Sequence, residues 1–562
     1  MKFKFRLIIV CAALLLSYAG LGYRLFRIQV TGYSRFSSLA RRSYYVLSEK
    51  TSPRRGNIYD RNGEVLAVNR HTYSVGYNSS RGNPCPQTVS AVASALNLNP
   101  IELRNRMNSG RFVWLARHTE PSAAGELKQI EDMGLLLTKE NHRLYPLSPV
   151  ASHLIGCVGT DNQGLSGVEF NFDHQLRGIQ GRRRLVRDAR GRLIYSAQDI
   201  SDEAASVDDI YLTIDSRLQY IAERELKKGF ERYSPEWAMA LIQKPDTGEI
   251  LAMAFYPGFD NNAPVLSSEV LNNKAVSNIF EPGSTFKIVT AAAALEENML
   301  RPHETIYCEE GEYEVGGFPI RDFEPHGDLT FTDIMVHSSN IGMAKLGEKL
   351  GRNLMYKYSR DFGFGNFTGI RLPGETRGIL RKPDSWSGTS LSRISFGQEI
   401  GVTGVQLVGA FSAIANGGVL YEPRIISRIL SGDSERVFEP LMIRRVVSRE
   451  TAREVARMMK KSVERGSGFK AQIPGYGVSG KTGTAQKYNP RTFSYKRGKY
   501  VALFGGSVPA DDPELTILVV FDEPDESLYW GGYVAAPVFR EIAEAALSCL
   551  GIPPRRDTAS SK

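Results

Sequence analysis

The chain has 562 residues, of which 42% are hydrophobic and 23% are charged, and its formal net charge is +9. This length exceeds one ordinary hydrophobic core, so we expect two or three folded domains and exclude an intrinsically disordered protein. The positive charge suits an anionic surface, but no nucleic-acid-binding motif accompanies it, so we expect an ordinary basic surface and no nucleic-acid partner.

The N-terminus combines a basic tip with an apolar run. Residues 1–6 are basic, Leu7–Tyr23 carries no charge, and Arg24 follows. A helix of this length spans roughly 26 Å, and the apolar residues beyond it extend the span. No small-residue cleavage site follows, which favours a retained membrane anchor over residues 7–28 rather than a cleaved signal peptide. The basic tip predicts a cytoplasmic N-terminus, with the rest of the chain outside the cytoplasmic membrane.

Neither the cysteines nor the histidines have the spacing of a metal site. The five cysteines lack C-x-x-C spacing, and the eight histidines include no H-E-x-x-H motif and no cluster with cysteine. We therefore predict no metal and no cofactor. Two disulfides among Cys85, Cys157, Cys308 and Cys549 are left open, because a core of this size does not require them.

The segment after the anchor is expected to mix strands and helices. Asp60–Gly63 predicts a turn between two short strands, and helical patterns follow at Val89–Leu96 and Ala124–Met133, with few strand signals around them. Glycines and arginines over Gly164–Ile194 predict a twisted β-ribbon with a solvated basic face, and binding of a glycan or a partner there is the alternative. An acidic linker near Asp202–Asp209 predicts a domain boundary.

The C-terminal region has strands at both ends and a long helical middle, which is typical of an α+β or α/β domain whose sheet joins distant segments. The predicted elements are a strand at Ile210–Ile214, a helix from Asp215 or Ser216 to about Phe230, a hairpin of Ala238–Ile242 with Ile250–Phe255, strands at Val501–Val508 and Leu515–Phe521, and a helix at Val538–Leu550. The tail after Pro553 is expected to be frayed.

A serine and a lysine are candidates for a nucleophile and its base. Ser284 and Lys287 are three residues apart at the start of an apolar helical segment, so their side chains share one face. A buried lysine with a lowered pKa is able to take the serine proton, and N–H groups at a helix start can stabilise an oxyanion. The same spacing recurs at Ser467 and Lys470 in a glycine-rich turn, so spacing alone is weak evidence, and we interpret this second copy as chance.

Two further segments make the pattern specific. Ser338–Asn340 lies between two helical patterns, where a loop can direct a hydroxyl and an amide into a cleft. Lys481–Thr484 is predicted to be a strand whose glycine admits another backbone or a ligand and whose lysine and threonines suit a carboxylate. The motifs S-x-x-K, S-x-N and K-T-G, in this order, form the active-serine set of penicillin-interacting enzymes.

On these motifs the chain resembles class B penicillin-binding proteins over nearly its whole length, and within them the septal transpeptidase of the FtsI type. Further segments that carry the resemblance are Arg55–Arg61, Gly164–Glu169, Ser395–Gln398 and Ala413–Gly418. The resemblance implies an α+β fold with an N-terminal transmembrane helix and an elongated α+β pedestal over residues 29–205. A transpeptidase domain over residues 206–550, with an antiparallel sheet, helices on both faces and an all-helical part, would precede a flexible tail at residues 551–562.

The resemblance also implies the reaction of the serine. Ser284 would attack the carbonyl between the two terminal D-alanines of a peptidoglycan stem peptide, with Lys287 as general base. Ser338 would relay a proton to the leaving amine, and Asn340 would hold Lys287 and the substrate amide. The acyl-enzyme would then pass its acyl group to an amine of a neighbouring stem, and β-lactams would trap the first step.

The remaining site residues would support this chemistry. The resemblance implies that Lys481 supports the proton network electrostatically and that Thr482, Gly483 and Thr484 bind the donor peptide. The backbone N–H groups of Ser284 and Thr484 would form the oxyanion hole. Partners would be the cytoplasmic membrane of a bacterium, a SEDS glycosyltransferase of the division complex and other divisome proteins, and we predict that the pedestal regulates activity through partner contact.

Four alternatives are weighed against this interpretation. Class A β-lactamases share the serine chemistry, but their E-x-x-L-N segment is absent between Asn340 and Lys481. The G-x-S-x-G motif of esterases is also absent, and His337, next to Ser338, is expected to be a helix residue rather than a base. A lateral-wall transpeptidase and a non-catalytic β-lactam sensor or division scaffold are the other two alternatives.

Overall fold

The computed structural model describes residues 2–43, 45–51, 54–130, 134–177, 181–187, 193–197, 207–263, 267–489 and 494–554. The chain forms two compact units, one of Met1–Pro53 with Gly178–Ser206 and one of Arg54–Arg177 with Val207–Lys562. The second unit contains the S-x-x-K, S-x-N and K-T-G motifs.

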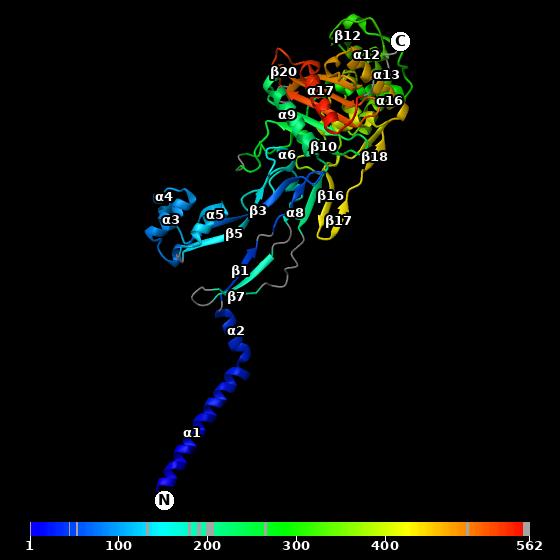
Figure 1. Cartoon of the computed structure of the whole chain (residues 1–562). Helices are drawn as coiled ribbons and strands as arrows, with labels where there is room; N and C mark the ends of the chain where they lie inside the picture. Colours follow the sequence, from blue (N-terminus) through cyan, green and yellow to red (C-terminus); the bar gives the residue numbers. More distant parts are fainter. Residues whose placement is uncertain are drawn as a thin grey trace. The chain divides into compact units, whose positions relative to one another are not determined.

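The first unit begins with a long apolar helix. α1 (Lys2–Phe26) continues through a π-helical turn, η1 (Arg27–Thr31), and is followed by α2 (Tyr33–Ser43). Among the described helices, Lys2–Thr31 alone (α1 and η1; Figure 1) is long and apolar enough to cross a membrane. Its large apolar side chains are exposed. Such a surface is stable in hydrocarbon but not in water, which suggests the expected single-pass anchor.

A three-stranded antiparallel sheet belongs to the same unit. In it β6 (Gly181–Arg187) lies between β1 (Tyr45–Thr51) and β7 (Leu193–Ala197). The predicted β-ribbon is therefore confirmed over its C-terminal half. The arginine side chains of that half lie outside the described residues, so its predicted basic face stays a prediction.

The N-terminal half of the predicted ribbon is wrong, because two short helices of the second unit occupy it. These are α7 (Gly167–Asn171) and α8 (Asp173–Arg177). Val168, Phe172 and Leu176 recur at every fourth position and are all buried. This is the period of a helix, and it outweighs the glycines that suggested a ribbon.

A mixed sheet runs through the second unit in the order β17-β16-β8-β2-β3-β4, with β5 also pairing with β3. Its strands are β2 (Ile58–Tyr59), β3 (Val65–Tyr77), β4 (Val113–Thr119), β5 (Leu135–Leu144), β8 (Asp208–Leu212), β16 (Ile426–Ser431) and β17 (Ser434–Val437). Only β2 and β8 pair in parallel among these described strands. The predicted turn at Asp60–Gly63 is confirmed, whereas the expectation of few strands nearby is wrong, since β4 and β5 flank β3.

Helices α3 (Pro86–Leu96), α4 (Pro100–Asn108) and α5 (Pro121–Leu127) pack on the β3 end of this sheet and share a small apolar core with it. A buried ion-pair network joins two of the segments that carry the family resemblance, Arg55–Arg61 and Gly164–Glu169. Arg55 Nε and Arg143 Nε each lie 2.6 Å from the Glu169 carboxylate, and all three side chains are buried. Glu169 is the centre of this network, because its loss would leave two buried arginines without their shared partner.

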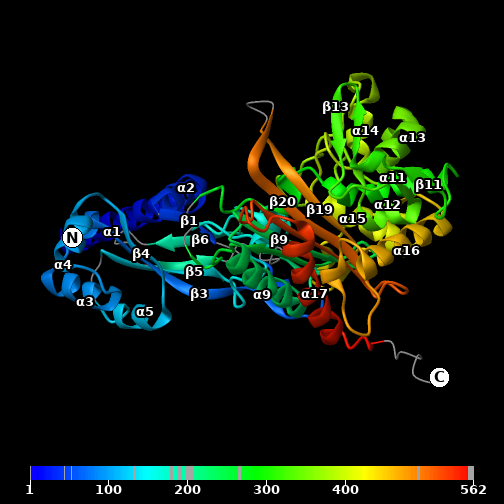
Figure 2. The same cartoon turned by 90° about the horizontal axis from the view of Figure 1, so that it is seen from above.

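A five-stranded antiparallel sheet forms the centre of the C-terminal region, in the order β10-β9-β21-β20-β19. The strands are β9 (Trp237–Gln243), β10 (Ile250–Tyr256), β19 (Ser479–Asn489), β20 (Ser494–Val508) and β21 (Leu515–Asp522). Helices α9 (Ser216–Tyr233) and α17 (Gly531–Cys549) lie side by side against it (Figure 2). Helix α15 (Gly404–Ala415) also packs on β9, β20 and β21, through the separate main core.

These elements confirm the predicted hairpin, the two late strands and the flanking helices, with two differences. β20 begins at Ser494, seven residues before the predicted start at Val501. The last helix begins at Gly531, seven residues before the predicted start, and contains Pro537. Pro537 is the seventh residue of α17 and has no N–H to donate to the Tyr533 carbonyl, which instead accepts a hydrogen bond from the Tyr233 hydroxyl at 3.1 Å. This proline hid the start of α17 in the sequence.

A helical part lies next to β19 and β20 (Figure 2). Its helices are α10 (Lys274–Ser277), α11 (Lys287–Glu296), α12 (Phe331–His337), α13 (Asn340–Asp361), α14 (Ser390–Ser395) and α16 (Arg449–Arg465). Short strand pairs accompany them: β11 (Thr305–Tyr307) with β14 (Asp328–Thr330), β12 (Glu312–Val315) with β13 (Phe318–Arg321), and β15 (Val419–Tyr421) with β18 (Met442–Arg445). The one remaining α-helix of the described residues is α6 (Ser152–Ile155).

The cysteines form no disulfide in the structure, which describes all five of them. Two of them are buried singly beside serines. Cys157 Sγ lies 3.8 Å from Ser166 Oγ, and Cys308 Sγ lies 3.5 Å from Ser339 Oγ. These two buried thiols pack as small apolar groups.

Candidate active site

Ser284 lies in a short 3₁₀ turn, η3 (Gly283–Phe286), which leads directly into α11. The first eight residues of α11 are buried, as is Phe286 of the turn, so the helix behind the serine is fixed in the core. The Ser284 side chain itself is only half-buried. Within the part of the chain that the structure describes, its hydroxyl forms no hydrogen bond, which leaves it open to a substrate.

Two glycines bring η3 against β19. A Cβ atom on Gly283, whose φ is +52°, would lie 3.0 Å from the Thr484 carbonyl oxygen. A Cβ atom on Gly483 would lie 2.9 Å from the Pro282 carbonyl oxygen. The glycine of the K-T-G segment thus admits another backbone, as predicted. Because β19 is the edge strand of its sheet, the K-T-G segment lies beside the serine with its outer edge unpaired by any described strand.

Lys287 is fully buried and bonds to the S-x-N segment rather than to Ser284. Its Nζ donates to the Ser338 carbonyl oxygen at 2.5 Å, to Ser338 Oγ at 3.2 Å and to Asn340 Oδ1 at 2.8 Å. The sequence predicted that the serine and lysine side chains share a face and can touch. The structure places them on consecutive turns, but the three donors of Nζ are already directed at Ser338 and Asn340.

A second buried lysine reaches the same point. Lys481 Nζ donates to Ser338 Oγ at 2.8 Å, and its side chain is also fully buried. Burial lowers the pKa of Lys481 to about 7. Burial, and then the charge of Lys481, hold the pKa of Lys287 well below its usual value. Two like charges around one hydroxyl are costly, so a neutral lysine is accessible here near neutral pH.

The S-x-N segment owes its position to an aspartate that the sequence analysis missed. Ser338 ends α12 in the left-handed region with φ +59°, and Ser339 caps α13. The Asp322 carboxylate accepts hydrogen bonds from Ser339 Oγ at 2.5 Å and from the N–H groups of Asn340 at 2.5 Å and Ile341 at 3.1 Å. Asp322 follows β13 and has no spacing relation to the motif, so no sequence pattern identified it.

The threonines of the K-T-G segment make contacts within the protein. Thr484 Oγ1 accepts a hydrogen bond from the Gly531 N–H at 3.0 Å, and Thr482 Oγ1 lies 2.9 Å from Ser467 Oγ. Ser467 was interpreted as part of a chance motif, yet the structure places its hydroxyl on the K-T-G segment. Its partner in spacing, Lys470, is not brought to this point, since Lys470 Nζ lies 4.3 Å from the ring centre of Tyr533.

A half-buried carboxyl supports the turn that carries Ser284. Glu281, which immediately precedes Pro282, accepts hydrogen bonds from the Glu399 N–H at 2.9 Å and from the Tyr495 hydroxyl at 3.1 Å. Burial raises the pKa of the Glu281 carboxyl to about 7. The turn that carries Ser284 is thus tied to β20 and to the loop after α14.

Comparisons with known proteins agree with this architecture. The penicillin-binding protein transpeptidase domain matches residues 238–544, and the penicillin-binding protein dimerisation domain matches residues 50–212. The first match covers the sheet, the helical part and all three motifs. The second covers the strands and helices of the pedestal region.

Curated relatives align with nearly the whole chain. The chain is 33% identical to the peptidoglycan D,D-transpeptidase FtsI of Escherichia coli over 100% of this chain and 94% of FtsI. It is 34% identical to stage V sporulation protein D of Bacillus subtilis over 91% of this chain and 80% of that protein. Penicillin-binding protein 3 of Mycobacterium tuberculosis in complex with ampicillin superposes with a TM-score of 0.71 at 28% identity, covering 91% of this chain and 98% of that one. The chain therefore belongs to the class B penicillin-binding proteins and is a serine-type peptidoglycan D,D-transpeptidase.

Proposed function

We propose that Ser284 is the acylated nucleophile of this transpeptidase and that Lys287 is its general base. In the first step the Ser284 oxygen attacks the D-Ala-D-Ala carbonyl, the bond to the terminal D-alanine breaks, and a proton reaches the leaving amine. In the second step the amine of a neighbouring stem attacks the ester, which restores the serine and forms a cross-link. The N–H groups of Ser284 and Thr484 are proposed to bind the oxyanion in both steps.

The other motif residues are proposed to manage the proton and the donor peptide. Ser338 relays the proton to the leaving amine, because its hydroxyl contacts both lysines. Asn340 orients Lys287 through its Oδ1, and Lys481 stabilises the negative charge that develops during proton transfer. Thr482, Gly483 and Thr484 are proposed to bind the donor, with the two hydroxyls exchanging their internal partners for the substrate.

One observation carries this assignment: two fully buried lysines from segments far apart in the sequence converge on the hydroxyl of Ser338. Burying a charged lysine is costly and lowers its pKa, and groups with strongly shifted pKa values cluster at functional sites. Labelling of the full-length protein with a fluorescent penicillin tests the nucleophile. We expect Ser284→Ala to abolish labelling and Ser467→Ala, with the same spacing to a lysine, to retain it. Persistent labelling of Ser284→Ala would refute the assignment.

We propose further that the enzyme acts in septal wall synthesis. Similarity to FtsI over the whole chain supports this role, while the similarity to a sporulation protein shows why a direct test is needed. A fluorescent fusion is expected at the division site of dividing cells, and its depletion is expected to give filaments. A fusion spread along the lateral wall, with rounded cells on depletion, would assign the protein to elongation instead.

The membrane arrangement and partners complete the proposal. Residues 7–28 are proposed to span the bacterial cytoplasmic membrane with residues 1–6 in the cytoplasm, followed by a pedestal at residues 29–205, the transpeptidase domain at residues 206–550 and a tail at residues 551–562. The chain is proposed to act with a SEDS glycosyltransferase and other divisome proteins through the pedestal. Pedestal substitutions that left stimulation by the glycosyltransferase unchanged would argue against this contact.

A further inference from the structure

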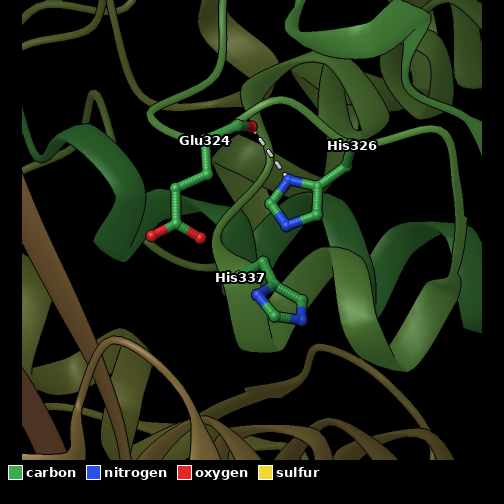
Figure 3. Close-up of side chains that lie close together, drawn as sticks. All are labelled: Glu324, His326 and His337. Carbon is green, nitrogen blue, oxygen red and sulfur yellow. Dashed lines mark hydrogen bonds between the residues drawn. The ribbon is translucent and has the colours of Figure 1, made fainter.

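A cluster of two histidines and a glutamate lies next to the S-x-N segment and takes no part in the proposed reaction. Glu324 and His326 lie between β13 and β14, and His337 is the last residue of α12. The three potential ligand atoms, one from each side chain, lie within 4.8 Å of one another (Figure 3). Glu324 and His337 are exposed, so an ion from solution has access to the cluster.

The tautomer of His326 is set by its backbone contact. His326 Nδ1 lies 2.9 Å from the Glu324 carbonyl oxygen, and because a carbonyl only accepts, Nδ1 carries the hydrogen. The lone pair of His326 is therefore on Nε2, the ring nitrogen that faces His337 in Figure 3. Histidines that bind metals typically donate their other N–H to a backbone carbonyl in this way, which fixes the ring before the ion arrives.

The donor set suits one class of ion. Two neutral imidazoles and one carboxylate are the ligands of open three-residue Zn²⁺ sites, in which water fills the fourth position. Harder ions such as Mg²⁺ and Ca²⁺ prefer oxygen ligands alone. The sequence predicted no metal because it has no H-E-x-x-H spacing. In this cluster Glu324 and His326 are two positions apart in a loop, and His337 follows eleven positions later at a helix end. No known metal-binding sequence motif has this spacing.

We propose that Glu324, His326 and His337 bind a single Zn²⁺ ion or a similar borderline transition-metal ion. The ion links the loop after β13 to the end of α12, and both of these support the S-x-N segment. On the loop side, Asp322 binds the N–H of Asn340 at 2.5 Å and the Arg321 carbonyl accepts from Asn340 Nδ2 at 2.9 Å. On the helix side, Ser338 directly follows His337. The ion is thus a positioning element for the segment and contacts none of the reacting atoms.

Metal binding is measurable without any substrate, so this inference does not rest on the proposed catalytic roles. The full-length protein in detergent, purified without a polyhistidine tag and stripped with a chelator, is titrated with Zn²⁺ by calorimetry and with Co²⁺ by visible absorption. We expect one ion per chain and ligand-field bands of a four-coordinate Co²⁺. His326→Ala and His337→Ala are each expected to weaken Zn²⁺ binding at least about tenfold.

Matched variants separate this site from general binding to surface histidines. His303→Ala removes another exposed histidine of the same region and is expected to bind Zn²⁺ like the wild type. Glu324→Gln keeps the shape of the side chain but loses its charge, and is expected to weaken binding without affecting folding. Zn²⁺ should also raise the melting temperature of the wild type but not of His326→Ala. Equal Zn²⁺ affinity for wild type and His326→Ala, or no binding to the wild type, would overturn the proposal.

Discussion

The chain contains two serine–lysine pairs with identical spacing, and their surroundings differ in almost every respect. Lys287 is fully buried and its Nζ makes three hydrogen bonds to Ser338 and Asn340. Lys470 is half-buried in the short turn η6 (Phe469–Ala471), with its Nζ over the ring of Tyr533. The comparison teaches that a reactive pair is defined by the burial of its lysine, because burial lowers the lysine pKa and spacing does not.

The sequence behind each lysine explains the difference. Lys287 is followed by a run of apolar residues whose helix, α11, lies inside the main core. Lys470 is followed by the buried Ala471 and the exposed Gln472, and the turn ends there without a helix behind it. The length of the apolar segment after the motif therefore indicates which of the two lysines is buried, whereas the motif does not.

The largest expected effect comes from removing each lysine in turn. Lys287→Ala is expected to slow acylation of Ser284 by a fluorescent penicillin by about 10²–10⁴-fold, because the serine loses its base. Lys470→Ala is expected to stay within about twofold of the wild-type rate. Rates are measured from time courses of labelling, and thermal melts show that both variants are folded. Equal rates for the two variants would contradict the comparison.

Asp322 positions the S-x-N segment that binds Lys287, and among the described residues the second serine–lysine pair is not bonded to this segment. Asp322→Asn weakens the hydrogen bonds that hold Ser339 and Asn340, and we expect acylation to slow by about 10–100-fold, the loss of one or two charge-assisted hydrogen bonds. Asp433→Asn, an exposed aspartate in the β16–β17 turn, serves as the control and is expected to leave the rate unchanged. Asp322 touches no reacting atom, so it should act through its charge. The pH at which acylation reaches half its maximal rate should therefore shift in Asp322→Asn. An unshifted pH profile would mean that the role of Asp322 is purely structural.

The pH dependence of acylation tests the buried lysines directly. Burial lowers the pKa of Lys481 to about 7 and holds that of Lys287 well below its usual value. A lysine accepts a proton only when neutral, so the acylation rate should rise with pH as Lys287 loses its proton, and the rise should be complete well below the pH at which an ordinary lysine titrates. Lys470→Ala should give the same curve. A rate that rises only in the pH range of an ordinary lysine would contradict a lowered pKa for the base.

The smallest expected effect concerns stability rather than rate. The Glu281 pKa of about 7 lies above its ordinary value of 4.5, so the folded protein holds this proton more tightly than the unfolded chain. Stability should then fall as pH rises from about 4.5 to about 7. Glu281→Gln should remove this loss and raise the free energy of unfolding above pH 7 by on the order of 1 kcal/mol. Glu464→Gln, next to the second pair, should keep the wild-type pH dependence in denaturant melts.

Much of the fold followed from hydrophobic pattern alone. The strands β9, β10 and β21 and the buried C-terminal half of β20 are continuous apolar runs, and the pattern places them to within a few residues. The N-terminal half of β20 is polar and exposed or half-buried, and the pattern missed it. Errors arose where glycine or proline outweighed the period. The helices at residues 167–177 follow glycines, and α17 contains Pro537, yet both segments are held by buried contacts that outweigh local preference.

The motifs of the site were predictable from the sequence, but the residues that hold these motifs in place were not. Three short motifs in a fixed order led to the residues that the structure places around Ser338 and β19. Asp322 and the contact of Ser467 with Thr482 were not predictable, because each depends on which loop the fold lays beside the motif. Single residues of this kind have no periodicity and no spacing, and only three-dimensional structure reveals them.

The strand order of the two large sheets also determines how late the protein can finish folding. β8 completes its sheet by pairing with β16, where Ile210 lies opposite Ile429, and β9 waits for β21, where Met239 lies opposite Val520. The mixed sheet lacks its last strands until residue 437 has been synthesised, and the five-stranded sheet lacks β21 until residue 522, so early strands remain with apolar edges unpaired. Long-range pairing of this kind folds slowly and leaves the chain prone to aggregation meanwhile. A truncated protein that ends before residue 426 lacks both β16 and β21, and we therefore expect it to lose both sheets rather than survive as a folded pedestal.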